Sequence, residues 1–330
     1  MKPFFYILSF FISCLALASC EDVIEFDEDE SNSLLVTHVM ATPDSILYAQ
    51  VTKSVFFLDI TDDPLKDKNG NYLGVTNAEV KLYVNGLFKE NMALISADSG
   101  IYKAGYIPQE KDEIRVVVSS PSIKETAEGS TILPQKIAIT VDTTVSYKEE
   151  MQFSYYNGQS SYDTIRWKLT HFTIHFTDNA TEENFYGVAV LEDDVQIDWT
   201  TMQFGTDSID NPLEIFTEDK IIFDGNKQDA KILIFEDDKI NGQAYSMSVY
   251  VKEITFSATD SLLLNLDPTP KTKRLKFYSF NKDAFLFLSS AKKNTASSGM
   301  SFFSEPNQVY TNIKHGIGII GGCSVAVKEY

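Results

Sequence analysis

Two histidines four residues apart are the first residues whose spacing suggests chemistry. On a helix, His171 and His175 would lie on one face and could bind one metal ion together. The residues around them alternate as in a β-strand, where four residues span about 13 Å. Two strand histidines at that separation cannot close on one ion, so we predict no metal site here and no cofactor for the chain.

Catalytic groupings are equally weak. The sequence has no Gly-x-Ser-x-Gly elbow, phosphate-binding loop, His-Glu-x-x-His helix or Cys-x-x-Cys pair. A thiol nucleophile would have to be Cys323 with His315, and we expect a buried structural thiol instead. Acidic pairs such as Asp193 and Asp194 fit a glycosidase by type, but adjacent acids at strand ends are usually solvated turns. We therefore predict no catalytic residue and a protein that is not an enzyme.

Five aromatic residues offer a different use, because their rings could stack on a sugar or a peptide. They are Tyr155, Tyr156, Tyr162, Trp167 and Trp199. The alternative is that the rings pack in the sheet core or against cross-strand neighbours, and the sequence favours that use for most of them.

The first twenty residues predict export and lipidation. Lys2 precedes an apolar run from Phe4 to Ala18 that is too short to span a bilayer comfortably. The following Leu17-Ala18-Ser19-Cys20 resembles the lipobox of bacterial lipoproteins. We expect residues 1–19 to be a signal peptide and the Cys20 thiol to carry the lipid anchor. The alternative is an ordinary secretory signal or an uncleaved signal anchor.

Charge and cysteine content restrict the partners and the means of stabilisation. Residues 20–33 are dense in acidic side chains, which predicts a flexible tether. The formal net charge of −19 disfavours nucleic acid as a partner, since both surfaces would be negative. After processing only Cys323 would remain as a free thiol, so no intrachain disulfide is expected and stability must come from packed cores.

From Leu34 onward, short apolar-polar alternations separated by turn residues predict an all-β protein. We expect an N-terminal immunoglobulin-like β-sandwich over residues 34–136. Residues 137–330 should form a larger β-rich sandwich or barrel-like domain with one packed helix near 282–293, because Asn281 can cap its start.

Two local features refine this second domain. The apolar parity changes near Thr170 and His171, which indicates a β-bulge. The four glycines at 316, 318, 321 and 322 indicate a closing hairpin whose backbone is approached closely, and we expect that hairpin to shape a docking face.

The order of several motifs resembles a family of Bacteroidota lipoproteins catalogued as domain of unknown function 4249. The C-terminal part of the resemblance is Glu305-Pro306, Asn312-Ile313 and Gly316-Ile317-Gly318. Upstream it includes Ala78-Glu79-Val80, Ser99-Gly100-Ile101-Tyr102, Ser130-Thr131-Ile132-Leu133-Pro134, Phe176-Thr177-Asp178 and Asn184-Phe185-Tyr186. Together these motifs extend over essentially the whole mature chain.

The resemblance implies location and company rather than a reaction. Members of the family are similar to accessory lipoproteins encoded near TonB-dependent outer-membrane transporters, and acidic residues after the lipid cysteine resemble a signal for export to the cell surface. We therefore expect a non-catalytic lipoprotein of the outer membrane that helps such a transporter in ligand capture or assembly. The alternatives are an envelope hydrolase acting on glycans or peptides, and a general adhesin.

Five tripeptides resemble the acceptor for O-glycosylation in Bacteroidota envelope proteins, which is Asp, then Ser or Thr, then an apolar residue or Thr. Their hydroxyl residues are Ser45, Thr143, Thr164, Ser208 and Ser261. Asp-Ser before a strand is also ordinary turn chemistry, so we expect some of the five to be modified.

Replacing Cys20 with Ala tests the lipobox. Because the thiol is the expected acylation site, the Cys20→Ala protein should not incorporate a labelled fatty acid and should leave the membrane fraction. The parent protein is the control. Equal labelling and retention of the two proteins would contradict the prediction.

Overall fold

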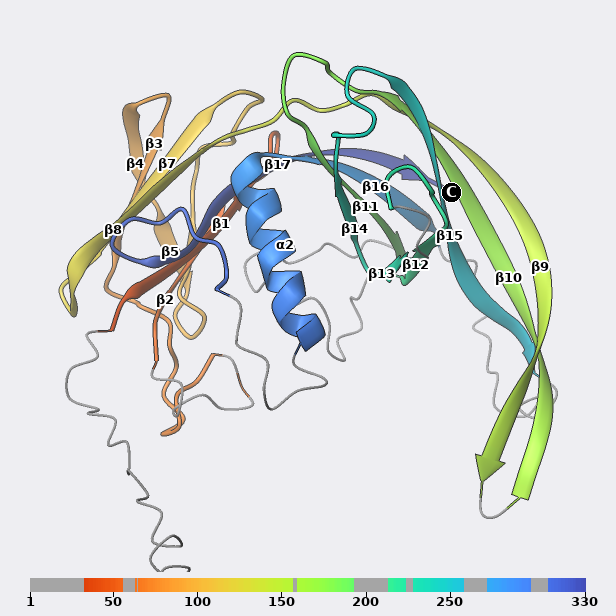
Figure 1. The fold of residues 1–330 in the computed structure, drawn as a ribbon. Coiled ribbons are helices and arrows are strands. Elements are labelled where there is room, and N and C mark those ends of the chain that lie inside the picture. Colours follow the sequence, from red (N-terminus) through yellow and green to blue (C-terminus); the bar gives the residue numbers. More distant parts are fainter. Residues whose placement is uncertain are drawn as a thin grey trace, which may run out of the picture. The chain divides into compact units, whose positions relative to one another are not determined.

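The structure is a computed structural model that describes residues 33–55, 63, 65–156, 159–192, 213–223, 228–257, 272–297 and 308–330. Residues Ser33–Tyr330 form one compact unit (Figure 1). The predicted signal peptide, Cys20 and all of the predicted tether except residue 33 lie outside the described residues.

The described residues form seventeen β-strands and one α-helix, with the strands arranged in three sheets. The eight-stranded sheet has the order β14-β11-β16-β17-β1-β2-β6-β5. Its strands are β1 (Leu35–Ala41), β2 (Tyr48–Lys53), β5 (Ala93–Ser96), β6 (Ile101–Lys103), β11 (Phe185–Glu192), β14 (Leu233–Glu236), β16 (Lys273–Phe280) and β17 (Ile317–Glu329). The four-stranded sheet, of order β4-β3-β7-β8, contains β3 (Glu79–Val84), β4 (Leu87–Asn91), β7 (Glu113–Ser120) and β8 (Ile123–Ile132). The five-stranded sheet, of order β13-β12-β15-β10-β9, contains β9 (Ile139–Tyr156), β10 (Gln159–Thr177), β12 (Ile215–Thr217), β13 (Gln228–Ala230) and β15 (Ala244–Ser257).

The first core lies between the four-stranded sheet and one end of the eight-stranded sheet. Strands β1 and β7 bury every second residue, as expected for strands with one face in a core. Leu82 and Val116 of the smaller sheet belong to the same buried cluster as Leu35 and Val51 of the larger one. The N-terminal half is therefore a β-sandwich.

The second core lies between the five-stranded sheet and the other end of the eight-stranded sheet. Phe172, Ile174 and Met247 of the five-stranded sheet pack in one cluster with Val188 and Phe277. The described sheets do not close into a barrel, so the sandwich form of the prediction is confirmed and the barrel-like form is not. The all-β class is confirmed as well.

Helix α2 (Lys282–Ser297) packs on the eight-stranded sheet through a third cluster. The Asn281 side chain caps the helix start, since its Oδ1 accepts a hydrogen bond from the Ala284 amide at 3.1 Å. The same oxygen accepts one from the Gly322 amide at 3.0 Å, which ties the helix start to β17. The predicted helix is present, and it continues past Lys293 to Ser297.

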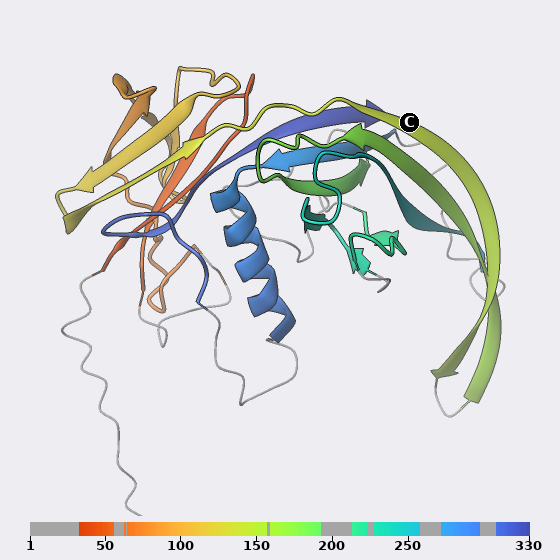
Figure 2. The same ribbon diagram turned by 45° about the horizontal axis from the view of Figure 1, so that its top comes forward.

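Strand β17 does not form the closing hairpin that its glycines suggested. It pairs in parallel with β1 and antiparallel with β16, so it lies inside the eight-stranded sheet (Figures 1 and 2). The glycines serve this position: Gly318 has φ +112°, and a Cβ there would overlap the Thr37 carbonyl oxygen of β1. The expected docking face at this strand is therefore wrong, because its middle is buried.

The prediction of a β-bulge near Thr170 and His171 is wrong, because β10 pairs regularly with both β9 and β15 at those residues. The β10–β15 register shifts between Arg166 and Trp167, and Thr255 of β15 is the residue left without a partner. The pairing of β10 with β9 has no such shift. An extra residue in β15 does not turn the side chains of β10, so the change of apolar parity has another origin: Phe172 and Ile174 face the second core, whereas Trp167 and Leu169 lie on the opposite face of a regular strand.

The predicted boundary between residues 136 and 137 crosses a shared sheet. Strand β1 comes from the first half and β16 from the second, and β17 pairs with both. The Ser324 hydroxyl of β17 also donates a hydrogen bond to the carbonyl of Pro134 in the connecting segment. Whether each half folds on its own stays a prediction.

Substituting Gly318 with Ala measures how much the free energy of unfolding depends on the close approach of β1 and β17. Gly86→Ala is a matched control, because Gly86 also has a positive φ of +78° but has open space around it. The control should cost only the backbone penalty of about 1–2 kcal/mol. Gly318→Ala should cost about 3 kcal/mol or more, because β1 and β17 must also move apart. Denaturant unfolding measures both values, and equal costs would contradict the close-contact argument.

Candidate functional site

The β9–β10 hairpin is the part of the fold that extends beyond the cores. Strands β9 and β10 pair along almost their whole length, from Ile139 with Phe176 to Tyr156 with Gln159. Strand β15 joins them only as far as Ile165. Among the described residues the outer part of the hairpin is therefore two-stranded, and both views show it continuing past β15 (Figures 1 and 2).

One face of this hairpin carries apolar side chains at both ends, and between them lie the charged residues Glu149, Arg166 and Lys168. Odd-numbered residues of β9 lie opposite even-numbered residues of β10, and at the inner end these residues, such as Phe172 and Ile174, are buried in the second core. At the outer end the same face carries large exposed side chains, with Met151 78% and Tyr162 74% exposed. We call this set the apolar row; it consists of Val145, Tyr147, Met151, Phe153 and Tyr162.

The predicted stacking residues are distributed unevenly in this region. Tyr162 lies in the apolar row, and its ring centroid is 5.2 Å from that of Phe153, its cross-strand partner. Trp167 lies on the opposite face of β10 and is partly buried. The side chains of Tyr155 and Tyr156, and all of Trp199, lie outside what the structure describes.

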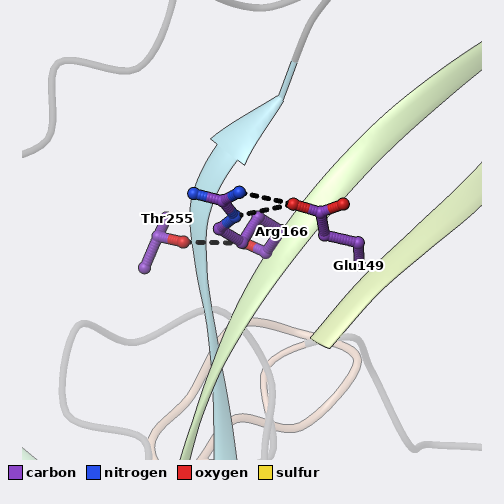
Figure 3. Close-up of polar contacts among 3 residues, drawn as sticks. All are labelled: Glu149, Arg166 and Thr255. Atoms are coloured by element: carbon purple, nitrogen blue, oxygen red, sulfur yellow. Dashed lines mark hydrogen bonds and ion pairs between the residues drawn. The ribbon is translucent and has the colours of Figure 1, made fainter. Parts of the chain in front are cut away.

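The charges along the hairpin neutralise one another. Arg166 donates to Glu149 Oε1 across the strands, with Nε at 2.9 Å, and the Thr255 hydroxyl donates to the Arg166 carbonyl at 3.0 Å (Figure 3). On the other face Lys148 Nζ is 2.6 Å from Glu150 Oε1, and this contact lowers the pKa of the Glu150 carboxyl. Residues 145–168 contain three basic and three acidic side chains, whereas the whole chain has a net charge of −19.

A Ser-His-Asp row crosses the inner end of the same sheet. His175 on β10 contacts Ser246 Oγ on β15 through Nδ1 at 2.7 Å and Asp142 Oδ2 on β9 through Nε2 at 3.1 Å. This combination contains the groups of a hydrolytic triad. Asp142 is 81% exposed, however, so water would screen its effect on the imidazole. The sequence could not reveal the row, because its members come from three strands.

Two cavities lie near the row and the connecting segment. The larger, of about 620 Å³, is lined by the segment from Ile132 to Ile137 and by Asn281 and Lys282. Its charged wall is partly neutralised, since Lys282 Nζ lies 2.7 Å from Glu183 Oε2. The smaller, of about 460 Å³, is lined by residues that include His175 and Ser246. Both volumes lie in the range of small-molecule sites.

Three of the five predicted glycosylation sites can be located. Ser45 follows Asp44, which has φ +59°, in the turn between β1 and β2, and its side chain is exposed. Thr143 of β9 is exposed and Thr164 of β10 is partly exposed. Ser208 and Ser261 lie outside the described residues. Modification of any of them stays a prediction.

The remaining candidate residue, Cys323, lies in the interior of the protein. Cys323 is fully buried beside the Thr42 hydroxyl, and burial raises the pKa of its thiol to about 11, so it is a structural thiol as expected. Within the described ranges, no cluster of three His, Cys, Asp or Glu side chains could hold a metal ion. In those ranges no helix is both long and apolar enough to cross a membrane.

Comparison with known proteins gives a family but no activity. No curated protein matches the chain. Among solved structures, a chain from Corynebacterium diphtheriae described as membrane anchored matches with 9% identity and a TM-score of 0.20, over 75% of this chain and 54% of that one. A TM-score this low does not indicate a shared fold. The family described as a domain of unknown function, DUF4249, matches residues 21–329. Because this match covers nearly the entire chain, the protein belongs to the DUF4249 family.

Proposed function

We propose that the protein is a non-catalytic lipoprotein of the outer-membrane surface that acts by association, as an accessory to a TonB-dependent transporter. Cys20 holds it at the membrane, and the acidic tether of residues 20–33 lets the folded part reach its partner. The supporting sequence features are the lipobox and the family-like order of motifs. The apolar row on the β9–β10 hairpin is the observation that carries the proposal.

The apolar row favours association because exposed apolar side chains of this size are costly in water. Each buried large apolar side chain contributes about 1.5–3 kcal/mol relative to its exposed state. Five such side chains on one face, with the paired charges of Glu149 and Arg166 between them, form the kind of exposed surface that marks an interaction site. Tyr, Phe and Met are also residue types enriched in protein interfaces.

Local charge balance supports the same surface. With a net charge of −19, most of the molecule repels other acidic surfaces. The outer hairpin avoids this repulsion because Glu149 and Glu150 are paired with Arg166 and Lys148. A partner can therefore approach the hairpin without meeting Glu149 or Glu150 as an uncompensated carboxylate.

The alternative function with a specific observation behind it is an envelope hydrolase, since Ser246, His175 and Asp142 lie in a row beside a cavity. Two features weigh against it. The exposed Asp142 is poorly placed to stabilise an imidazolium, and the regular sheet pairing around His175 engages the local backbone amides that an oxyanion hole would need. A general adhesin is the remaining alternative, and it would use the apolar row without a transporter.

Crosslinking in intact cells tests the proposal. A tagged protein should recover a TonB-dependent transporter, and deleting its gene should reduce uptake of that transporter's ligand. Met151→Glu should reduce the recovery several-fold, because a carboxylate would be desolvated in the interface. Leu87→Glu is the matched control, since Leu87 is 74% exposed on β4, in a different sheet, and should leave recovery unchanged.

Two outcomes would overturn the proposal. One is recovery of no transporter by a protein that is correctly lipidated and at the surface. The other is labelling of the purified protein by a fluorophosphonate probe, lost in Ser246→Ala, together with turnover of a glycan ester or peptide. That second result would establish the hydrolase alternative.

A further inference from the structure

Strand β9 has a long unpaired edge. It is the last strand of the five-stranded sheet, and β10 covers one side of its eighteen residues. No strand in the described part of the chain pairs with its other side. The outward-pointing amide and carbonyl groups of such an edge can accept another strand.

The devices that usually protect an edge strand are weak in β9. Its sequence contains no proline, and its pairing with β10 shows no bulge. Its single lysine, Lys148, is paired with Glu150 on the same strand. The edge is thus long, regular and locally neutral, which is the form that favours strand addition.

Stereochemistry limits how a second copy could add to this edge. In an antiparallel pair, directly opposite residues either both point their backbone groups at each other or both point them away. Both copies present the same strand, so an odd-numbered residue must face an odd-numbered one. Each allowed register therefore places one residue opposite itself on a twofold axis.

Charge then selects among these registers. An axis at Lys148, Glu149 or Glu150 would place like charges directly opposite each other, but of these three residues Glu149 is the one paired with a basic residue of another strand, Arg166 of β10. An axis at Tyr147 or Met151 would place neither Lys148 nor Glu150 opposite a charged residue. An axis at Glu149 places Lys148 opposite the partner's Glu150 and Glu150 opposite the partner's Lys148. Two favourable cross-strand charge pairs form in this register. An axis at Val145 would also form two, between Lys148 and the partner's Asp142, but it would place Tyr147 opposite the partner's Thr143, whereas the Glu149 axis places Tyr147 opposite the partner's Met151.

The same register accommodates the other side chains. Tyr147 would face the partner's Met151, and Val145 would face the partner's Phe153, so the two apolar rows join on one side of a continuous sheet. Glu149 would face itself on the axis, and its contact with Arg166 already compensates its charge in each copy (Figure 3). In this arrangement Arg166 would reduce the repulsion between the two Glu149 carboxylates that face each other.

We propose that two copies of the chain pair antiparallel through the free edges of β9, with the twofold axis at Glu149. This dimer goes beyond the function proposed above, since it uses the backbone edge and leaves the joined apolar rows exposed. Its test involves no transporter, so its failure would be distinguishable from a failure of that proposal.

Disulfide trapping of the full chain in its membrane tests both the contact and its register. Cells that express Tyr147→Cys and Met151→Cys copies together should form a mixed disulfide dimer, because those residues lie directly opposite, about 5 Å apart at Cβ. Met151→Cys alone should not crosslink, since its two copies would be about 13 Å apart along the strands. Buried Cys323 gives no background. Equal crosslinking of all variants, or exclusive crosslinking to another protein, would overturn the proposal.

Charge reversal provides a test that does not depend on cysteine. For the purified lipidated protein in detergent micelles, sedimentation should show a dimer, and Lys148→Glu should weaken it about tenfold because two opposite-charge pairs become repulsive. Lys148→Glu combined with Glu150→Lys should restore it, since the opposite charges are exchanged. A monomeric parent protein, or a double variant as weak as the single one, would contradict the proposed register.

Discussion

The parallel contact between β1 and β17 is the constraint on which the rest of the structure depends. It joins the first described strand to the last, so it closes a loop of nearly the whole folded chain. Strand β17 also contributes to each of the three cores, with Ile320 in the first, Ala326 in the second and Ile319 in the third. Because contacts of such high sequence separation carry a large closure entropy, the cores and this pairing must form together for either to be stable.

This arrangement also restricts which surfaces of the protein could bind a partner. A strand that has sheet neighbours on both sides and buried side chains on both faces cannot offer a docking surface, so the glycine-rich segment belongs to the architecture. The five-stranded sheet is different, because only its inner end lies on the second core. Its outer end keeps exposed apolar residues on the core-facing side, and no core lies beneath them among the described residues. That mismatch between pattern and burial is why we propose the hairpin as a binding element.

The sequence predicted features that are encoded locally and missed those that are not. Alternation within β1 or β7 and the capping side chain of Asn281 are local, and the structure has both. The partner of β17 lies some 280 residues away, and the glycines that permit its approach resemble those of a hairpin turn. The bulge expected near Thr170 is absent for a similar reason: a change of apolar parity resembles a slipped residue, but in a regular β10 it only reflects apolar residues on two faces.

The candidate sites show the same division. Tyr162 was identified by its residue type, and the structure adds that its neighbours make it part of an exposed row. His175 was considered with His171 because the two are close in sequence, whereas its hydrogen-bond partners Ser246 and Asp142 come from other strands. Cross-strand neighbours depend on register, and register follows from the whole sheet rather than from a local pattern.

The charge distribution connects these observations with association. A chain with a net charge of −19 stays soluble by repelling its own copies and other acidic surfaces, so any contact it makes must occur where that repulsion is cancelled locally. Along the outer hairpin the cancellation is built in pairs, Glu149 with Arg166 on one face and Lys148 with Glu150 on the other. Exposed ion pairs of this kind add little to folding stability. Their proposed effect is on approach: they reduce the electrostatic repulsion at a described surface that also carries exposed apolar side chains, which is why we propose association there.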